Sequence, residues 1–480
     1  MKLTKPMVSN RVDVVIVGAG LSGLMTARLL QELGLQVQVL EARQAVGGRL
    51  QSTLTTTGSV VDLGGQWGGA THHRLAALVE DLGLERYPSH YAGDGVLFWR
   101  GQRLQAPLVD GHDDSLLFFE PGALDLDPAI WVATRDLQRS LGDLVSRIDR
   151  QRPWLTQDAE HLDRISVASW AASLCSEPLA ELPLSWLCRV GGSGGFEPWE
   201  ASILHLAWTQ AVAPQADNPE SWLVRGGVAP MAQRMAEQLS LKSPGSVLLE
   251  VSVQEVSQDN DGVDVRIEGG PTIRARAVVV AVPPQQRLGI HFQPPLPAAH
   301  SAFVQRSPMG AMTKILAIYD QAFWRELGLN GLGVGNLNVL ELTADSGPPE
   351  GTPGILAAFA SGQRALRLGA LDPSQQREAI LSDLQALWGP QAREPVELIV
   401  KPWTGEPWIG GAFTSFPLPG SWTSYAALAA GNQGGPGPCD HGRVVWAGTE
   451  ASARWPGYCE GALEAAERAA QAAEQWCLAR

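Results

Sequence analysis

The chain has 480 residues, of which 45% are hydrophobic and 18% are charged, the composition of a folded protein rather than a disordered one. Single cores stop growing near roughly 250–300 residues, so we expect two domains. The formal net charge is −14, and no basic block occurs along the chain. Binding to nucleic acid or to an anionic membrane surface is therefore not expected, since both require clustered Lys and Arg.

The five cysteines are spread along the chain without CxxC spacing. This spacing predicts neither a zinc site nor a disulfide framework, and it fits a reducing compartment. The first ten residues are not followed by the apolar run of a signal peptide, and no apolar stretch reaches the roughly 18 residues needed to cross a bilayer. We therefore expect a cytoplasmic protein without a metal site, and we leave a homodimer open.

The first predicted unit is an apolar, valine-rich strand over residues 12–17. A glycine-rich turn at residues 18–23 follows, and then a helix with apolar residues at helical spacing that ends at Gly34. A second apolar strand over residues 37–40 completes a βαβ unit. This pattern predicts an α/β fold with a Rossmann-like domain that binds a dinucleotide.

Each glycine of the turn has a physical reason in such a domain. Gly18 permits the tight turn out of the strand, Gly20 lets the backbone approach a pyrophosphate, and Gly23 lets the helix pack closely on the strand. The start of the helix offers free N–H groups to the phosphates. Glu41, at the end of the second strand, is placed to accept hydrogen bonds from a ribose diol.

The rest of the chain alternates between sheet-like and mixed segments. Strands are predicted over residues 247–256, 263–267, 275–282 and 444–447, with a hairpin turn at 259–262. Helices are predicted over residues 72–82, 135–150 and about 461–478, and a flexible loop at 431–438. We expect a discontinuous nucleotide domain of residues 1–90, 222–290 and 430–480, and a mixed α+β substrate domain of residues 91–221 and 291–429.

Several motifs resemble the flavin-containing monoamine oxidase family. They are the runs Glu41-Ala42-Arg43 with Gly47-Gly48-Arg49, Asp62-Leu63-Gly64-Gly65-Gln66-Trp67, Gly310-Ala311-Met312-Thr313-Lys314, Ala447-Gly448-Thr449-Glu450 and Trp455 to Ala462. They occur in family order from one end of the chain to the other. The resemblance implies a two-domain fold that holds FAD and an oxidase that uses oxygen to convert a small amine substrate to an imine, with hydrogen peroxide as the other product.

The resemblance also implies which residues hold FAD. Those near the AMP and the pyrophosphate would be Gly18, Gly20, Gly23, Glu41, Arg43, Gly48 and Arg49, with Val253 meeting the adenine through its backbone. Those along the ribityl chain and the flavin would be Gly65, Gln66, Trp67, Gly448, Thr449, Glu450, Gly461 and Ala462. Arginine suits pyrophosphate because its planar fork binds two oxygens at once.

The reactive face would be formed by one lysine and two aromatic rings. Lys314 lies in the apolar, strand-like run of residues 312–319, where a lysine is costly without a function. In the family this lysine holds a water against flavin N5 and assists reaction with oxygen. The paired rings that orient the amine match Phe413 and Tyr458. Family members that attach FAD covalently carry a cysteine where this chain has Ala412, so we expect dissociable FAD.

Other proteins of related fold remain as alternatives. L-Amino-acid oxidases need a cation for the substrate carboxylate, and the run Gly68-Gly69-Ala70 supplies none, which favours a simple amine. Polyamine oxidases need acidic groups along a tunnel. The Asp residues between 110 and 127 fit such a tunnel, but solvated loops explain them equally well. Carotene desaturases and protoporphyrinogen oxidases match the motifs around Lys314 and Tyr458 poorly. Chaperones of prenylated GTPases use a related fold for binding without catalysis.

Overall fold

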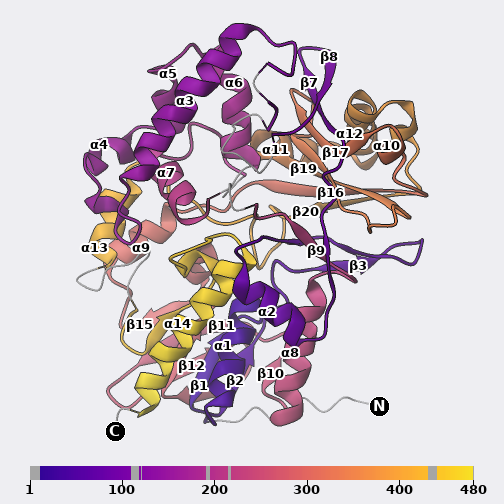
Figure 1. The fold of residues 1–480 in the computed structure, drawn as a ribbon. Helices are drawn as coiled ribbons and strands as arrows, with labels where there is room; N and C mark the ends of the chain where they lie inside the picture. The colour runs from indigo at the N-terminus through magenta and orange to yellow at the C-terminus, as the bar shows by residue number, and fades with distance from the viewer. Residues whose placement is uncertain are drawn as a thin grey trace.

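The computed structural model describes residues 11–109, 118–120, 122–190, 195–214, 218–430 and 440–478. Its lower half in Figure 1 is built on a five-stranded sheet in which every pairing is parallel. The strands, in order across the sheet, are β10 (Val247–Leu248), β2 (Val37–Leu40), β1 (Val14–Val17), β14 (Ala277–Val280) and β21 (Val444–Trp446). The three central strands are buried at every position, as their valine-rich runs require for a sheet covered on both faces.

The first and the last described helices pack together on this sheet. Helix α1 (Leu21–Glu32) packs against α14 (Cys459–Leu478) and α8 (Ala229–Lys242), and Figure 1 shows α14 and α1 side by side in front of the strands. The predicted βαβ unit and the final strand and helix are therefore confirmed. The strands come from the three segments that we assigned to the nucleotide domain, and we keep that division as a proposal.

A four-stranded sheet lies beside the parallel one, in the order β13 (Thr272–Ala275), β12 (Val263–Ile267), β11 (Val253–Gln258) and β15 (His291–Gln293). The hairpin turn between β11 and β12 is confirmed, with the Asp259 N–H bonded to the Gly262 carbonyl at 3.0 Å. The single strand predicted over residues 247–256 is wrong. Glu250 adopts a φ of 59°, which ends β10 and redirects the chain into β11 in the other sheet.

The upper half contains a seven-stranded sheet and a layer of helices (Figure 1). The sheet order is β20 (Glu397–Pro402), β16 (Met312–Tyr319), β19 (Gly354–Ser361), β18 (Leu342–Asp345), β17 (Leu329–Gly335), β7 (Asp94–Trp99) and β8 (Gln102–Ala106). The strand predicted over residues 312–319 is β16, buried along its whole length.

Ten helices that the structure describes belong to this upper half or border it: α3 (Pro128–Ser146), α4 (Ala159–Arg164), α5 (Val167–Ala172), α6 (Glu177–Ser185), α7 (Ile203–Val212), α9 (Ala298–Gln305), α10 (Phe323–Glu326), α11 (Gly362–Gly369), α12 (Pro373–Trp388) and α13 (Ala427–Ala430). The helix predicted over residues 135–150 is α3, which begins two turns earlier because Asp127 caps it and Pro128 follows. None of the described helices is long and apolar enough to cross a membrane.

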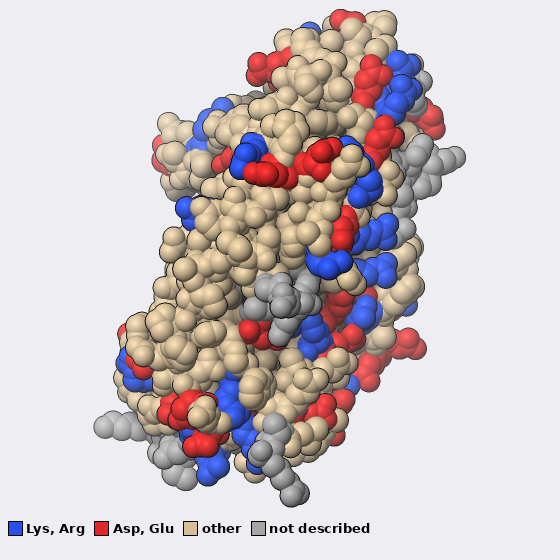
Figure 2. All heavy atoms as spheres, turned by 90° about the vertical axis from the view of Figure 1, so that its left-hand side faces the viewer, with Lys and Arg blue, Asp and Glu red and all other residues tan. Residues whose placement is uncertain are grey.

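Short strands join the two halves. A three-stranded sheet in the order β5 (Trp67–Gly68), β9 (Trp222–Val224) and β6 (Arg86–Pro88) follows the Gln66-Trp67 motif, and β3 (Ser52–Leu54) pairs with β4 (Val60–Asp62). The helix predicted over residues 72–82 is α2 (His73–Asp81), whereas the loop predicted at 431–438 lies outside the described residues. On the face in Figure 2, basic and acidic side chains are interspersed rather than gathered into a patch of one sign.

Candidate active site

The turn between β1 and α1 forms a cradle that side chains would fill. A Cβ on Gly23 would lie 2.0 Å from the Gly18 carbonyl oxygen, and Gly18 has a φ of +102°. Gly20 begins α1 without a side-chain cap and faces the Gly48 backbone across the turn. The first N–H groups of α1 are therefore left for a ligand, as binding of a pyrophosphate requires.

Acidic and basic side chains at the end of β2 flank this cradle. The buried Glu41 carboxylate accepts hydrogen bonds from the backbone N–H of Ala19 at 2.7 Å and of Arg43 at 3.0 Å. Arg43 donates to the Gly48 carbonyl at 3.1 Å. Val253 begins β11 and is almost fully buried. The residue types and the shape fit the adenosine part of FAD, and each contact with the cofactor stays a prediction.

A bidentate ion pair joins three distant parts of the chain. Arg49 donates to the two oxygens of Glu450 at 2.6 and 3.1 Å, and to the Phe413 carbonyl at 2.8 Å. Burial acts to raise the pKa of Glu450, but the charge and hydrogen bonds of Arg49 lower it overall. Much of the binding capacity of Arg49 is thus used by Glu450, and a contact of Arg49 with the pyrophosphate stays a prediction.

Lys314 is buried in the middle of β16. Its Nζ donates to the Gly64 carbonyl at 2.8 Å and to the side-chain oxygen of Gln66. Burial lowers the pKa of Lys314 to about 7, and the nearby charge of Asp62 only partly opposes this. Near neutral pH, both the charged and the neutral amine are therefore present at this site.

The Gln66 side chain supplies an unused donor. Its Nε2 is buried without a hydrogen-bond partner among the described residues, which is costly unless a ligand accepts from it. Gly65 beside it has no side chain, and a Cβ there would come within 3.2 Å of Leu50. An orphaned donor beside a side-chain-free backbone fits the polar edge of a flavin ring.

One large cavity of about 1330 Å³ opens above these residues. Trp67, Phe359, Phe413 and Tyr458 all line it. The Phe413 ring packs edge-on against Phe359 at 5.7 Å, and the Tyr458 ring packs against Trp455 at 5.1 Å. The structure thus brings both predicted rings to the wall of one cavity, next to Gln66.

The carboxyl-terminal motif is held in place by its own hydrogen bonds. The Thr449 hydroxyl accepts from the Gly457 N–H at 2.7 Å and donates to the Tyr458 carbonyl at 3.0 Å. The Gly448 N–H donates to Ser22 at the start of α1 at 3.0 Å. Gly461 and Ala462 lie in the first turn of α14, which begins two residues before the predicted start.

Four side chains near the site were not singled out from the sequence. His72 is buried; burial lowers its pKa to about 4, and its ring packs against Tyr458 at 5.5 Å. Asp62 lies close enough to influence Lys314, and Phe359 and Glu220 line the cavity. The Asp62-to-Trp67 motif could have indicated Asp62, whereas no local pattern marks Glu220.

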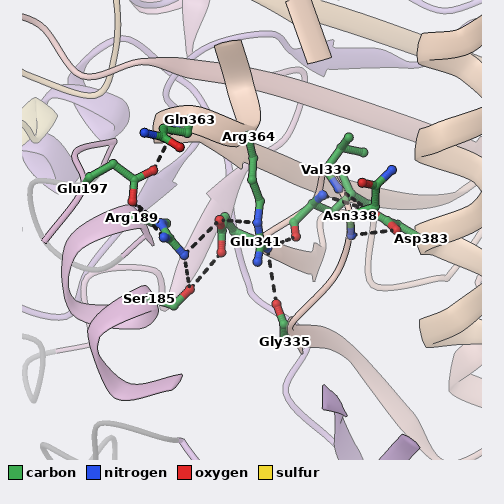
Figure 3. A network of polar contacts seen from close by, with 11 residues as sticks. Ser185, Arg189, Glu197, Gly335, Asn338, Val339, Glu341, Gln363, Arg364 and Asp383 are labelled. Carbon is green, nitrogen blue, oxygen red and sulfur yellow. Dashed lines mark hydrogen bonds and ion pairs between the residues drawn. The ribbon is translucent and has the colours of Figure 1, made fainter. Parts of the chain in front are cut away.

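A buried polar network (Figure 3) joins two segments of the chain that line the cavity. Trp186 and Leu187 line the cavity from a π-helix (Trp186–Val190), whose Arg189 pairs with Glu197 at 2.7 Å and Glu341 at 3.7 Å. Arg364 of α11 pairs with the same Glu341 at 3.0 Å. Glu341 directly precedes β18, which lines the facing side. The Arg–Glu–Arg arrangement therefore links the π-helix, β18 and α11 through buried charges.

Comparison with known proteins shows which proteins this chain is similar to. The family model described as flavin containing amine oxidoreductase matches residues 21–473. The chain is 35% identical to an L-amino acid dehydrogenase of Synechocystis sp., over 97% of this chain and 95% of that protein. The structure of cyclohexylamine oxidase from Brevibacterium oxydans superposes with a TM-score of 0.85 and 30% identity, covering 97% of this chain and 99% of the other.

A third relative points the same way. Putrescine oxidase bound to putrescine superposes with a TM-score of 0.84 and 27% identity, covering 96% of this chain and 98% of the other. The expected fold of a Rossmann-like sheet with a mixed substrate-domain sheet is therefore confirmed. FAD-dependent oxidation of an amine or an amino acid is the activity that these matches share. The chain belongs to the family of flavin-containing amine oxidoreductases.

Proposed function

We propose that this enzyme oxidises an amine with oxygen as the electron acceptor, using FAD that is not covalently attached. The observation that carries the proposal is Lys314, which is buried and donates a hydrogen bond to Gln66, a residue that lines the aromatic cavity. When bound, FAD takes a hydride equivalent from the α carbon of the amine and gives the electrons to oxygen, so that an imine and hydrogen peroxide are formed.

The chain's own residues would position the reactants. The aromatic rings of Phe413 and Tyr458 line the cavity, and aromatic walls suit a neutral amine better than a hydrated ion. Lys314 would hold a water and, when charged, stabilise the negative charge that develops as oxygen is reduced. Only 2% of the Lys314 surface is exposed, and burial strengthens that interaction.

We base non-covalent binding on the two described positions where a cysteine nucleophile would be expected, Ala412 and Cys459. Ala412 occupies the family's cysteine position and is held there by a hydrogen bond from its N–H to the Gly310 carbonyl at 3.0 Å. Cys459 also lines the cavity, but burial raises its pKa to about 12. Its thiol therefore keeps its proton, and a thiol is a far weaker nucleophile than a thiolate.

A second candidate is the same oxidation performed on an amino acid, with an acceptor other than oxygen. The relative named L-amino acid dehydrogenase favours it, and so do Arg150 and Arg454, two exposed side chains that the fold brings to the cavity. Either guanidinium could bind a substrate carboxylate.

One screen separates the candidates. Primary, secondary and polyamines are tested beside amino acids, once with a peroxide-coupled assay and once with an artificial electron-accepting dye. Peroxide formed from simple amines supports the first proposal. Activity confined to amino acids and to the dye supports the second, and a colourless protein without either activity indicates a binding role.

A further inference from the structure

Glu220 is an acidic side chain in the cavity that has no ion-pair partner among the described residues. It lines the same cavity as Phe413 and Tyr458. No ion pair to its carboxylate is found within the described part of the chain, and the internal segments outside that part contain no Lys or Arg. Burial raises the pKa of Glu220 to about 8, because no neighbouring charge offsets the loss of water.

The other inner carboxylate of the cavity is already satisfied. Asp345 accepts from Arg325 at 2.7 and 2.8 Å, from the Trp324 indole N–H at 2.8 Å and from the Gly347 N–H at 2.9 Å. Glu464, a third carboxylate of the cavity, accepts from the Arg454 N–H at 2.9 Å. Glu220 alone among these three has no partner of its own in the described residues.

The backbone holds Glu220 close to the reactive face. The hydroxyls of Ser89 and Tyr91 both donate to the Glu220 carbonyl, at 2.6 and 3.0 Å. Two residues later the chain enters β9, and Leu223, three residues after Glu220, pairs with Trp67 of the flavin motif. Three residues span at most about 10 Å, so the carboxylate lies within reach of the far end of a small substrate.

We propose that Glu220 binds a second cationic group of the substrate, remote from the amine that is oxidised. The inference rests on the proposed function, because it assigns the substrate class of that same site. A substrate of this class has an ammonium or guanidinium at the end of a carbon chain about as long as that of lysine. Its charge supplies the counter-ion that the fold withholds from Glu220, and pairing with it lowers the pKa of Glu220.

Three probes of equal chain length test the proposal. Pentylamine has one amine, cadaverine adds a terminal amine, and lysine adds an α-carboxylate to cadaverine. The FAD-loaded enzyme is expected to prefer cadaverine or lysine to pentylamine. Glu220→Gln should lower kcat/KM for the preferred dication about 10- to 100-fold, the effect of losing a hydrogen-bonded charge pair, and should leave pentylamine within about twofold.

Controls separate recognition from folding. Glu464→Gln removes another carboxylate of the same cavity and should leave the preference unchanged. Glu220→Asp, which keeps the charge, should recover part of the preference. Calorimetric titration of the FAD-loaded protein with cadaverine and with lysine measures binding apart from turnover, and Glu220→Gln should weaken it by the same factor.

The outcomes separate failure of the Glu220 inference from failure of the proposed function. Equal loss with pentylamine and with the dications would show that Glu220 only shapes the cavity, and this overturns the inference while the proposed function stands. No oxidation of these three or of any compound in the wider screen, with oxygen or with a dye, removes the proposed function. In that case calorimetry still tests the inference. Equal affinity of wild type and Glu220→Gln for the dications would overturn the inference as well.

Discussion

Replacement of Lys314 by methionine tests the reactive face directly. Methionine fills similar space without the charge, so the fold and FAD binding should be kept. The fall of the Lys314 pKa from 10.5 to about 7 corresponds to about 5 kcal/mol against the charged form in the folded protein. Loss of one preorganised group that stabilises developing charge costs about 100-fold in rate or more. We expect Lys314→Met to slow reoxidation of the reduced enzyme by about that factor at pH 6.

The same pKa predicts a pH dependence in the wild type. If only the charged lysine assists, a pKa of about 7 makes the rate fall roughly tenfold between pH 6 and pH 8, and Lys314→Met should show no such fall. The enzyme is reduced without oxygen and mixed rapidly with oxygenated buffer, while recovery of flavin absorbance is followed. Lys401→Met is the matched control, because Lys401 pairs with Lys314 in the sheet but binds Glu406 at 2.6 Å. A rate for Lys314→Met within about threefold of wild type would refute the reasoning.

Three further predictions follow from the same contacts. Acid precipitation should release the flavin colour to the supernatant, whereas Ala412→Cys should keep part of it in the pellet; wild-type colour in the pellet would contradict dissociable FAD. Arg49→Ala should lower the free energy of unfolding by about 3 kcal/mol at pH 7 in a urea titration, because Glu450 stays buried without its partner. Arg49 lowers the pKa of Glu450 in the folded wild type, so the difference in stability between wild type and Arg49→Ala should shrink as the pH falls below about 4.5. Phe413→Ala should raise KM for amines about tenfold and Phe413→Tyr less than twofold, and equal effects would argue against a ring contact.

The nucleotide-binding part of the fold could be predicted from local sequence patterns. The glycine turn, the valine-rich strands and the apolar run around Lys314 each contain their own signal, because burial on both faces of a strand leaves continuous apolar residues in the sequence. The break at Glu250 was missed because a residue with positive φ leaves no such signal when it is not glycine or asparagine.

Long-range pairings explain the other misses. The seven-stranded sheet pairs β17 with β7, from opposite halves of the chain, in a parallel register, and nothing in either segment names its partner. The cavity has the same origin. Arg150, Glu220 and Arg454 line it only because of the fold, so an argument from sequence spacing that found no arginine near the flavin motif could not detect Arg150 or Arg454.

The central claim is that this chain passes electrons from an amine through bound FAD to oxygen. The most direct measurement is a spectrum of the purified yellow protein mixed with an amine without oxygen, followed by admission of air. The account predicts bleaching of the flavin by the amine, recovery of the colour in air and one hydrogen peroxide per amine consumed. A flavin that no amine or amino acid bleaches would contradict it.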